Sequence, residues 1–209
     1  MTALDSAPAP GVTTGARGES GPGLVLPGPA ALLIIDMQKA FDDPVWQPRN
    51  NPEAEAIAGR LLAAWRDSRR LVIHVQHLSR EPGSSYRPDG PGVEFKDEVR
   101  PRAGEIVVQK RTNNAFIDTG LEALLHERGI ASLVTVGVIT NNSVEATVRM
   151  AGNLGFTTYV VADATATIDK QDLDGRLWPA DEVQALSLAN MAGEYATVTD
   201  SRSVLAALG

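Results

Sequence analysis

Six short apolar runs, separated by segments with helical periodicity, constrain the fold of this 209-residue chain more than any other feature. The runs are uniformly apolar instead of alternating between apolar and polar residues, a pattern typical of parallel strands that are buried on both faces. They occupy residues 31–35, 71–75, 106–108, 133–136, 158–161 and 196–198. Strands that alternate with helices predict an α/β fold of three layers (α/β/α), in which a six-stranded parallel sheet lies between helices.

The segments between the runs carry apolar residues at helical spacing. The predicted helices cover residues 53–69, 121–128, 144–154, 182–191 and 201–208. Residues 1–29 are rich in proline and glycine, so we expect a flexible N-terminal tail. Residues 30–209 then form one domain, since no internal repeat or second unit is evident.

One long connection, residues 78–104, is rich in Pro, Gly, Arg and Ser and has little periodicity. Long loops in compact domains are often functional. A surface excursion or a contact between subunits explains the same composition equally well.

The composition excludes several classes of protein. The net charge of -7 argues against general nucleic-acid binding, and the lack of cysteine excludes disulfides and thiolate metal sites. No apolar run approaches the roughly 18 residues of a membrane span. Because the N-terminus also lacks the pattern of a secretory signal, we expect a cytoplasmic protein without a membrane partner.

Polar side chains follow several of the predicted strands. Asp36 ends the first run, Gln76 and His77 follow the second, Lys110 follows the third, and residues 140–143 follow the fourth. Ligands of an open parallel sheet bind beyond the carboxyl ends of its strands, so these residues mark the candidate site.

Three of these residues have side chains suited to catalysis. A partly desolvated carboxylate at Asp36 suits proton transfer, and Lys110 is its obvious partner because an unpaired buried charge is costly. Asn142 and Glu145 predict a capping box, which would place Ser143 at a helix N-terminus, where negative charge is stabilised. Each position also fits a structural role: a turn residue, a solvated lysine and a helix cap.

Four segments in this order resemble the signatures of the isochorismatase-like, or cysteine hydrolase, superfamily. They are residues 33–41 (LIIDMQKAF), Lys110 with residues 114–116 (NAF), residues 137–151 (GVITNNSVEATVRMA) and residues 160–166 (VVADATA). Each short motif is weak alone, but the ordered set is a strong signal. The resemblance covers residues 30–205 and implies the Rossmann-like fold of that family.

The resemblance also implies a mechanism without a cofactor. Asp36 is then the general base and acid, Lys110 orients the site and stabilises charge, and Ser143 stands where most members have a nucleophilic cysteine. The peptide between Val138 and Ile139 is expected to be cis, and the backbone N–H groups of Ile139 and Ser143 to form the oxyanion hole. The predicted substrate contacts are Phe41, Gln76, His77, Asn114, Phe116, Thr140 and Asn142.

The serine leaves three interpretations open. Ser143 is a natural nucleophile beside Lys110, or a natural residue that does not attack, or a cysteine-to-serine change that traps substrate. The first favours hydrolysis of a small carbon–nitrogen amide. The alternatives are vinyl-ether hydrolysis of an isochorismate-like acid, with Asp36 as the acid, and a small-molecule-binding homologue without activity. Family members are usually oligomers, so a homo-dimer or homo-tetramer is expected.

Other ligands find little support in the sequence. His74 and His77 lie three residues apart on one predicted strand and point to opposite faces, so we expect no metal site. The glycine pattern of a dinucleotide site is missing after the first strand. Arg80, Arg87 and Arg111 would favour an acidic substrate if they lay at the mouth of the site, and are otherwise scattered surface arginines.

Overall fold

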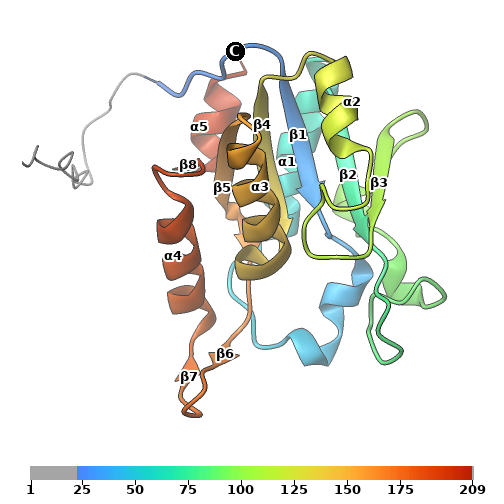
Figure 1. Ribbon diagram of the computed structural model, residues 1–209, viewed down its shortest axis with the longest axis vertical. Helices are drawn as coiled ribbons and strands as arrows, with labels where there is room; N and C mark the ends of the chain where they lie inside the picture. Colours follow the sequence, from blue (N-terminus) through green and yellow to red (C-terminus); the bar gives the residue numbers. More distant parts are fainter. Residues whose placement is uncertain (1–22, 209) are drawn as a thin grey trace, which may run out of the picture.

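A six-stranded sheet forms the centre of the computed structural model, which describes residues 23–208 (Figure 1). The strand order is β3-β2-β1-β4-β5-β8, and every neighbouring pair is parallel. The predicted parallel sheet is therefore confirmed. Its strands are β1 (Ala30–Ile35), β2 (Val72–His77), β3 (Ile106–Lys110), β4 (Ser132–Val138), β5 (Thr157–Ala166) and β8 (Thr197–Thr199).

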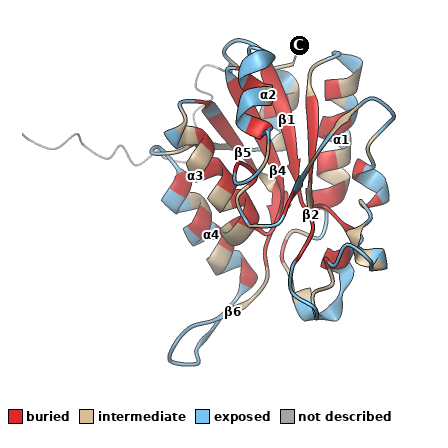
Figure 2. Ribbon diagram, turned by 45° about the vertical axis from the view of Figure 1, so that its right-hand side comes forward, coloured by how far each residue is buried: buried red, intermediate tan, exposed pale blue. Residues whose placement is uncertain are grey.

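Helices cover both faces of the sheet, so the central strands are buried on each side (Figure 2). One face packs against α1 (Ala54–Asp67) and α5 (Ser201–Ala206), and the other against α2 (Leu121–Glu127), α3 (Glu145–Asn153) and α4 (Ala180–Met191). Successive residues of β1 point to opposite faces: Leu32 belongs to the α1 side and Leu33 to the α2 side. Both faces are apolar environments, which explains why β1 is a continuous apolar run.

The edge strands depart from the expected uniform burial. In β3, exposed and partly buried residues alternate up to the buried Lys110, and β8 has no fully buried residue. An edge strand has only one neighbour, and helices cover it incompletely, so solvent reaches part of its surface.

The segment before β1 packs against the molecule. Leu24 and Leu26 contact the core on the α1 side, and the hydroxyl of Tyr159 donates to the carbonyl of Val25 at 2.9 Å. Residues 1–22 of the predicted tail lie outside the described residues. Packing therefore begins before Ala30, where the sequence indicated the start of the domain.

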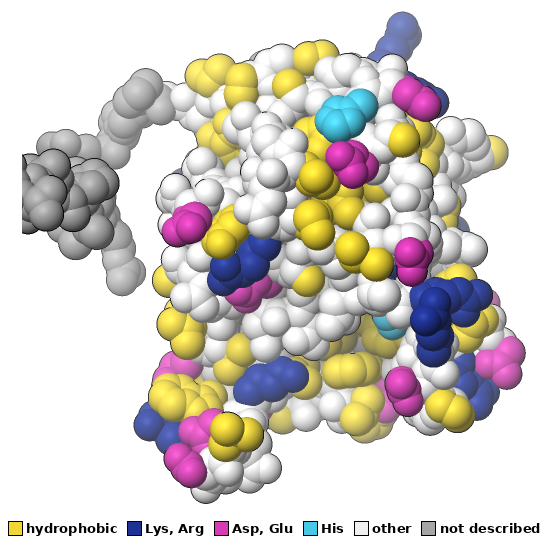
Figure 3. Space-filling view, in the orientation of Figure 1, with side chains coloured by type: hydrophobic (Ala, Val, Ile, Leu, Met, Phe, Trp, Pro, Cys, Tyr) yellow, Lys and Arg dark blue, Asp and Glu magenta, His cyan; other side chains and the backbone are white. Residues whose placement is uncertain are grey.

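The sequence did not predict a small antiparallel hairpin, formed by β6 (Lys170–Gln171) and β7 (Leu177–Trp178), that projects beyond α4 (Figure 1). Its apolar side chains are visible on the surface in Figure 3, and Leu173 and Leu177 are exposed. Strands of two residues are too short to show a periodic pattern, which is why the sequence gave no indication of them.

Short helical turns connect the main elements near the carboxyl edge of the sheet. They are η1 (Lys39–Asp42), η2 (Pro44–Trp46), η3 (Pro91–Val93), η4 (Asp97–Val99) and the π-helical turn η5 (Thr140–Val144). The predicted capping box is wrong: η5 leads directly into α3, and no side chain caps the α3 N-terminus. The carboxylate of Glu145 instead binds Arg149 and Ser187. Among the described residues, no helix combines the length and apolar character needed to cross a membrane.

Candidate active site

Asp36, Lys110 and Ser143 come together at the carboxyl edge of the sheet. Asp36 follows β1, Lys110 is the last residue of β3, and Ser143 lies in η5 after β4. The Lys110 Nζ lies 2.6 Å from the Asp36 Oδ2 and 3.2 Å from the Ser143 Oγ. The three side chains therefore form one connected group, as their places at strand ends predicted.

Lys110 is the centre of this group. Its side chain is 0% exposed, and Nζ also donates to the carbonyl of Thr112 at 3.1 Å. The His77 Nδ1 also lies 3.4 Å from Nζ. An ammonium group has three hydrogens, so these four acceptors use its full donor capacity. The charge of Lys110 stays inside the protein because the carboxylate of Asp36 neutralises it.

Asp36 keeps one carboxylate oxygen free. Its side chain is 5% exposed, and its backbone has a left-handed φ of 53°. The second oxygen, Oδ1, is buried and has no hydrogen-bond partner within the described residues. A buried carboxylate oxygen without a donor is costly, so this atom is available to accept a proton or hydrogen bond from a ligand.

A cavity of about 230 Å³ opens beside this group. Of the predicted site residues, Asp36, Ser143, Val138, Ile139, His77 and Asn142 line it. The Val138–Ile139 peptide is cis, the configuration that the family resemblance implies. Lys110 does not line the cavity itself, but its Nζ binds two residues that do, Asp36 and Ser143.

The other five predicted substrate contacts do not line the cavity. Both aromatic residues belong to the core: Phe41 packs against Val138 and Ile139, and Phe116 stacks on Phe156.

The three polar residues of this set bind protein atoms instead of facing the cavity. Gln76 donates to the carbonyl of Val93, and Asn114 donates to the carbonyl of Ala146. The hydroxyl of Thr140 donates to the side-chain oxygen of Gln184. These contacts hold the loops around the cavity, so Gln76, Asn114 and Thr140 support its shape.

The sequence did not predict half of the residues that line the cavity. The missed residues are Trp46, Ser79, Glu81, Ser84, Tyr86 and Asn113. Four of them belong to the long connection of residues 78–104, which supports its functional interpretation. Composition marked this segment as unusual, but without periodicity it gave no indication of which side chains face the site.

Two ionisable side chains of the wall are held neutral. Burial lowers the pKa of His77, and the positive charge of Lys110 lowers it further, although Asp36 acts in the opposite direction. Burial raises the pKa of Tyr86 well above its usual value, and the nearby carboxylate of Asp36 adds to this. At neutral pH both side chains are therefore uncharged.

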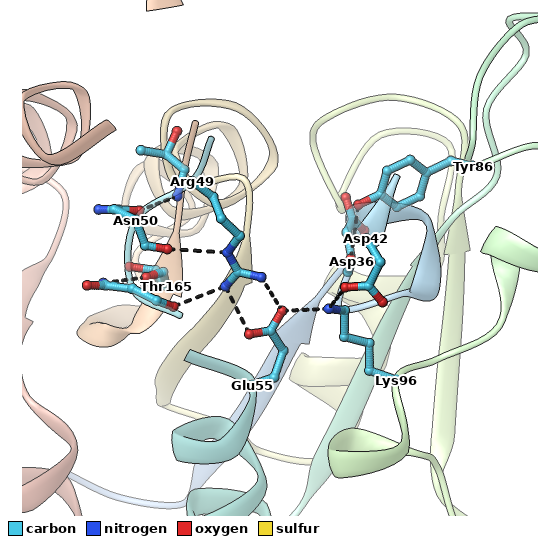
Figure 4. Close-up of polar contacts among 10 residues, drawn as sticks. Asp36, Asp42, Arg49, Asn50, Glu55, Tyr86, Lys96 and Thr165 are labelled. Atoms are coloured by element: carbon cyan, nitrogen blue, oxygen red, sulfur yellow. Dashed lines mark hydrogen bonds and ion pairs between the residues drawn. The ribbon is translucent and has the colours of Figure 1, made fainter. Parts of the chain in front are cut away.

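A second group of charges fixes the loop after β1 (Figure 4). Arg49 binds both oxygens of Glu55, at 2.6 and 2.9 Å, and Lys96 bridges Glu55 and Asp42. Burial opposes ionisation of Glu55, but hydrogen bonds from Arg49 and Lys96 outweigh it and lower the pKa of Glu55. This network ties η1 and α1 to the connection that forms the cavity wall.

The histidines do not gather around a common point. His74 is fully buried and lies 3.0 Å from Glu105, while His77 faces the cavity. No cluster of three or more His, Asp or Glu side chains suited to a metal ion occurs in residues 23–208.

Comparisons with known proteins identify the family. The isochorismatase domain model matches residues 30–203. The chain belongs to the isochorismatase family. A solved structure of an isochorismatase-family protein from Chromobacterium violaceum is 55% identical, with a TM-score of 0.88, over 90% of this chain and 98% of the other.

Two of the similar proteins are hydrolases of known name. A streptothricin hydrolase from Streptomyces noursei is 39% identical over 66% of this chain and 50% of its own length. A maleamate amidohydrolase from Pseudomonas putida is 29% identical over 72% of this chain and 78% of its own length. This chain is accordingly a hydrolase of the isochorismatase family.

Proposed function

We propose that this hydrolase cleaves a small carbon–nitrogen amide, with Asp36, Lys110 and Ser143 as its catalytic residues and no cofactor. The main support for this proposal is the position of Lys110, whose Nζ binds both Asp36 and Ser143 beside the cavity. The amidohydrolase relative supports the choice of a carbon–nitrogen bond.

The proposed reaction passes through an acyl-serine intermediate. The Ser143 Oγ attacks the amide carbon while its proton passes to the carboxylate of Asp36. Asp36 then returns this proton to the leaving nitrogen, and the carbon–nitrogen bond breaks. A water molecule, deprotonated by Asp36, hydrolyses the acyl-serine, and Ser143 regains its proton.

Lys110 and the backbone supply electrostatic stabilisation in this scheme. The ammonium of Lys110 donates to the Ser143 Oγ, which favours the developing alkoxide. The backbone N–H groups of Ile139 and Ser143 are the proposed donors to the oxyanion. Both residues line the cavity, which supports this assignment.

The test compares turnover by the unmodified chain with that of Asp36→Asn, Ser143→Ala and Ser143→Cys on small primary amides and isochorismate. We expect ammonia release from an amide, reduced at least about 100-fold by Asp36→Asn. Ser143→Ala should lose turnover similarly, and hydroxylamine should capture the acyl group only when Ser143 is present. Asp67→Asn, an exposed change of the same kind at the far end of α1, is the matched control.

Other results would change the assignment. Full activity of Asp36→Asn would overturn the proposed base, and full activity of Ser143→Ala would mean that Asp36 activates water directly. Turnover of isochorismate alone would favour vinyl-ether hydrolysis. Activity only in Ser143→Cys would mean that the serine disables the site, and ligand binding without turnover in every variant would favour the inactive homologue.

We also propose a cytoplasmic homo-dimer or homo-tetramer that acts on a small molecule and binds no nucleic acid. The net charge of -7 supports the last point. Leu173, Leu177 and Leu186 are exposed on the hairpin and α4, which supports self-association. Light scattering during gel filtration measures the state directly, and a monomer would contradict the proposal.

A further inference from the structure

We propose that this site selects a cationic substrate, namely a small amide that carries an ammonium group a few bonds from its carbonyl. The inference rests on the proposed amide hydrolysis and adds a charge class to it. It follows from three properties of the cavity: its uncompensated charge, its aromatic wall and the position of the surrounding cations.

The cavity has one uncompensated charge, and it is negative. The acidic residues of the lining are Asp36 and Glu81, and no lysine or arginine lines it. Lys110 neutralises Asp36 at 2.6 Å. Glu81 is exposed and has no ion pair within residues 23–208, so its carboxylate is free to attract a cation.

The aromatic rings of Trp46, His77 and Tyr86 line the same cavity as Glu81. Tyr86 packs edge to face against Trp46, with centroids 6.0 Å apart, and against His77 at 5.6 Å. The Trp46 Nε1 donates to the hydroxyl of Ser85 at 2.9 Å, which fixes the indole. Aromatic faces attract ammonium groups by cation–π interaction, and Trp and Tyr do so best.

No arginine side chain lines the cavity where it could pair with an anionic substrate. Arg87 pairs with Asp89, and neither Arg80 nor Arg111 lines the cavity. The three hydrogens of the Lys110 ammonium are already shared among acceptors of Asp36, Ser143, Thr112 and His77. The sequence alone also allowed an acidic substrate. Such a substrate would lie near the carboxylate of Glu81, with no lysine or arginine in the cavity lining to pair with it.

The small volume of the cavity limits the size of the substrate. The cavity volume of about 230 Å³ lies below the roughly 300–1,000 Å³ of sites for drug-sized ligands. β-Alaninamide has an ammonium two carbons from its amide carbonyl and is small enough to serve as the probe. Butyramide and succinamate share its amide and chain length but are neutral and anionic.

The experiment measures hydrolysis of these three amides by the unmodified chain and their binding to Ser143→Ala by calorimetry. We expect kcat/KM and affinity to rank cation, neutral, anion, with about a tenfold advantage of β-alaninamide over butyramide at low salt. Glu81→Gln should lower that ratio about threefold, and Glu122→Gln, an exposed carboxylate on α2, should not. Trp46→Leu should also lower it, without reversing the order.

The two measurements separate the two proposals. Hydrolysis of all three amides at similar kcat/KM, or a preference for succinamate, would overturn the charge selection and leave the amidase proposal intact. Absence of hydrolysis with the expected order of binding would overturn the amidase proposal and leave the charge selection intact. No binding of β-alaninamide, or an unchanged ratio in Glu81→Gln, would overturn the role assigned to this wall.

Discussion

At the scale of single residues, Lys110 and Asp36 form a buried pair in which each charge depends on the other. Their side chains are 0% and 5% exposed. Lys110→Met leaves a carboxylate in the interior without its cation, which typically costs about 3–5 kcal/mol. We expect the free energy of unfolding to fall by that amount and turnover to be lost, as measured by urea denaturation and ammonia release.

The double variant Asp36→Asn/Lys110→Met is the control for this prediction. It removes both charges, so its free energy of unfolding should recover most of the loss, while its activity should not return. Equal stability of Lys110→Met and the unmodified chain would contradict the buried pair. Recovery of turnover in the double variant would show that neither charge takes part in the reaction.

At the scale of elements, one carboxylate joins the sheet to a covering helix. Glu105, immediately before β3, binds Arg66 of α1 at 2.7 Å and His74 of β2 at 3.0 Å. Burial opposes its ionisation, but hydrogen bonds from Arg66, the backbone N–H of Arg102 and His74 outweigh it and lower the pKa of Glu105 to about 2. The ionised form therefore stabilises the attachment of β3.

This shift predicts how stability depends on pH. The pKa of Glu105 is lower in the folded than in the unfolded chain, so its contribution is complete above about pH 4.5 and is lost as the pH falls towards 2. Glu105→Gln should lower the free energy of unfolding by about 1–2 kcal/mol at pH 7, with the difference from the unmodified chain shrinking below pH 4.5. Urea denaturation across this range measures it. A difference independent of pH would contradict the mechanism, and Glu122→Gln should show none.

At the scale of the whole molecule, the main elements were predictable because uniformly apolar runs mark the strands and helical spacing of apolar residues marks the helices. The sheet was predictable because β1, β4 and β5 lie between two helical layers, and each of them contains a short run of apolar residues. Asp36, Lys110 and Ser143 were predictable as neighbours because parallel strands bring their carboxyl ends to one edge.

The cavity wall was not predictable in this way. Glu81 and Tyr86 lie in a segment without a repeating pattern, and their positions depend on contacts across the fold, such as the pairing of Tyr86 with Trp46. Asn114 and Asn113 are adjacent in sequence, yet only Asn113 faces the cavity, because Asn114 caps the turn of Phe116 and binds Ala146. Sequence spacing alone does not determine such orientations.

Residues 23–29 contribute to the stability of the whole domain, although they lie far from the candidate active site. A chain that begins at residue 30 loses the packing of Leu24 and Leu26 and leaves the hydroxyls of Tyr159 and Ser132 without their acceptors. Compared with a chain that begins at residue 23, its free energy of unfolding should fall by about 2–4 kcal/mol.

Urea denaturation of the two shortened chains measures this difference, and Leu24→Ala/Leu26→Ala in the longer one isolates the apolar part. Ser132 opens β4 at the amino end of the sheet, whereas Ser143 lies beyond its carboxyl end. Because the segment does not reach the cavity, kcat/KM should be equal in the two chains at temperatures where both are folded. Equal unfolding midpoints would contradict the packing role, and a lower kcat/KM in the folded shorter chain would show that the two ends of the sheet are coupled.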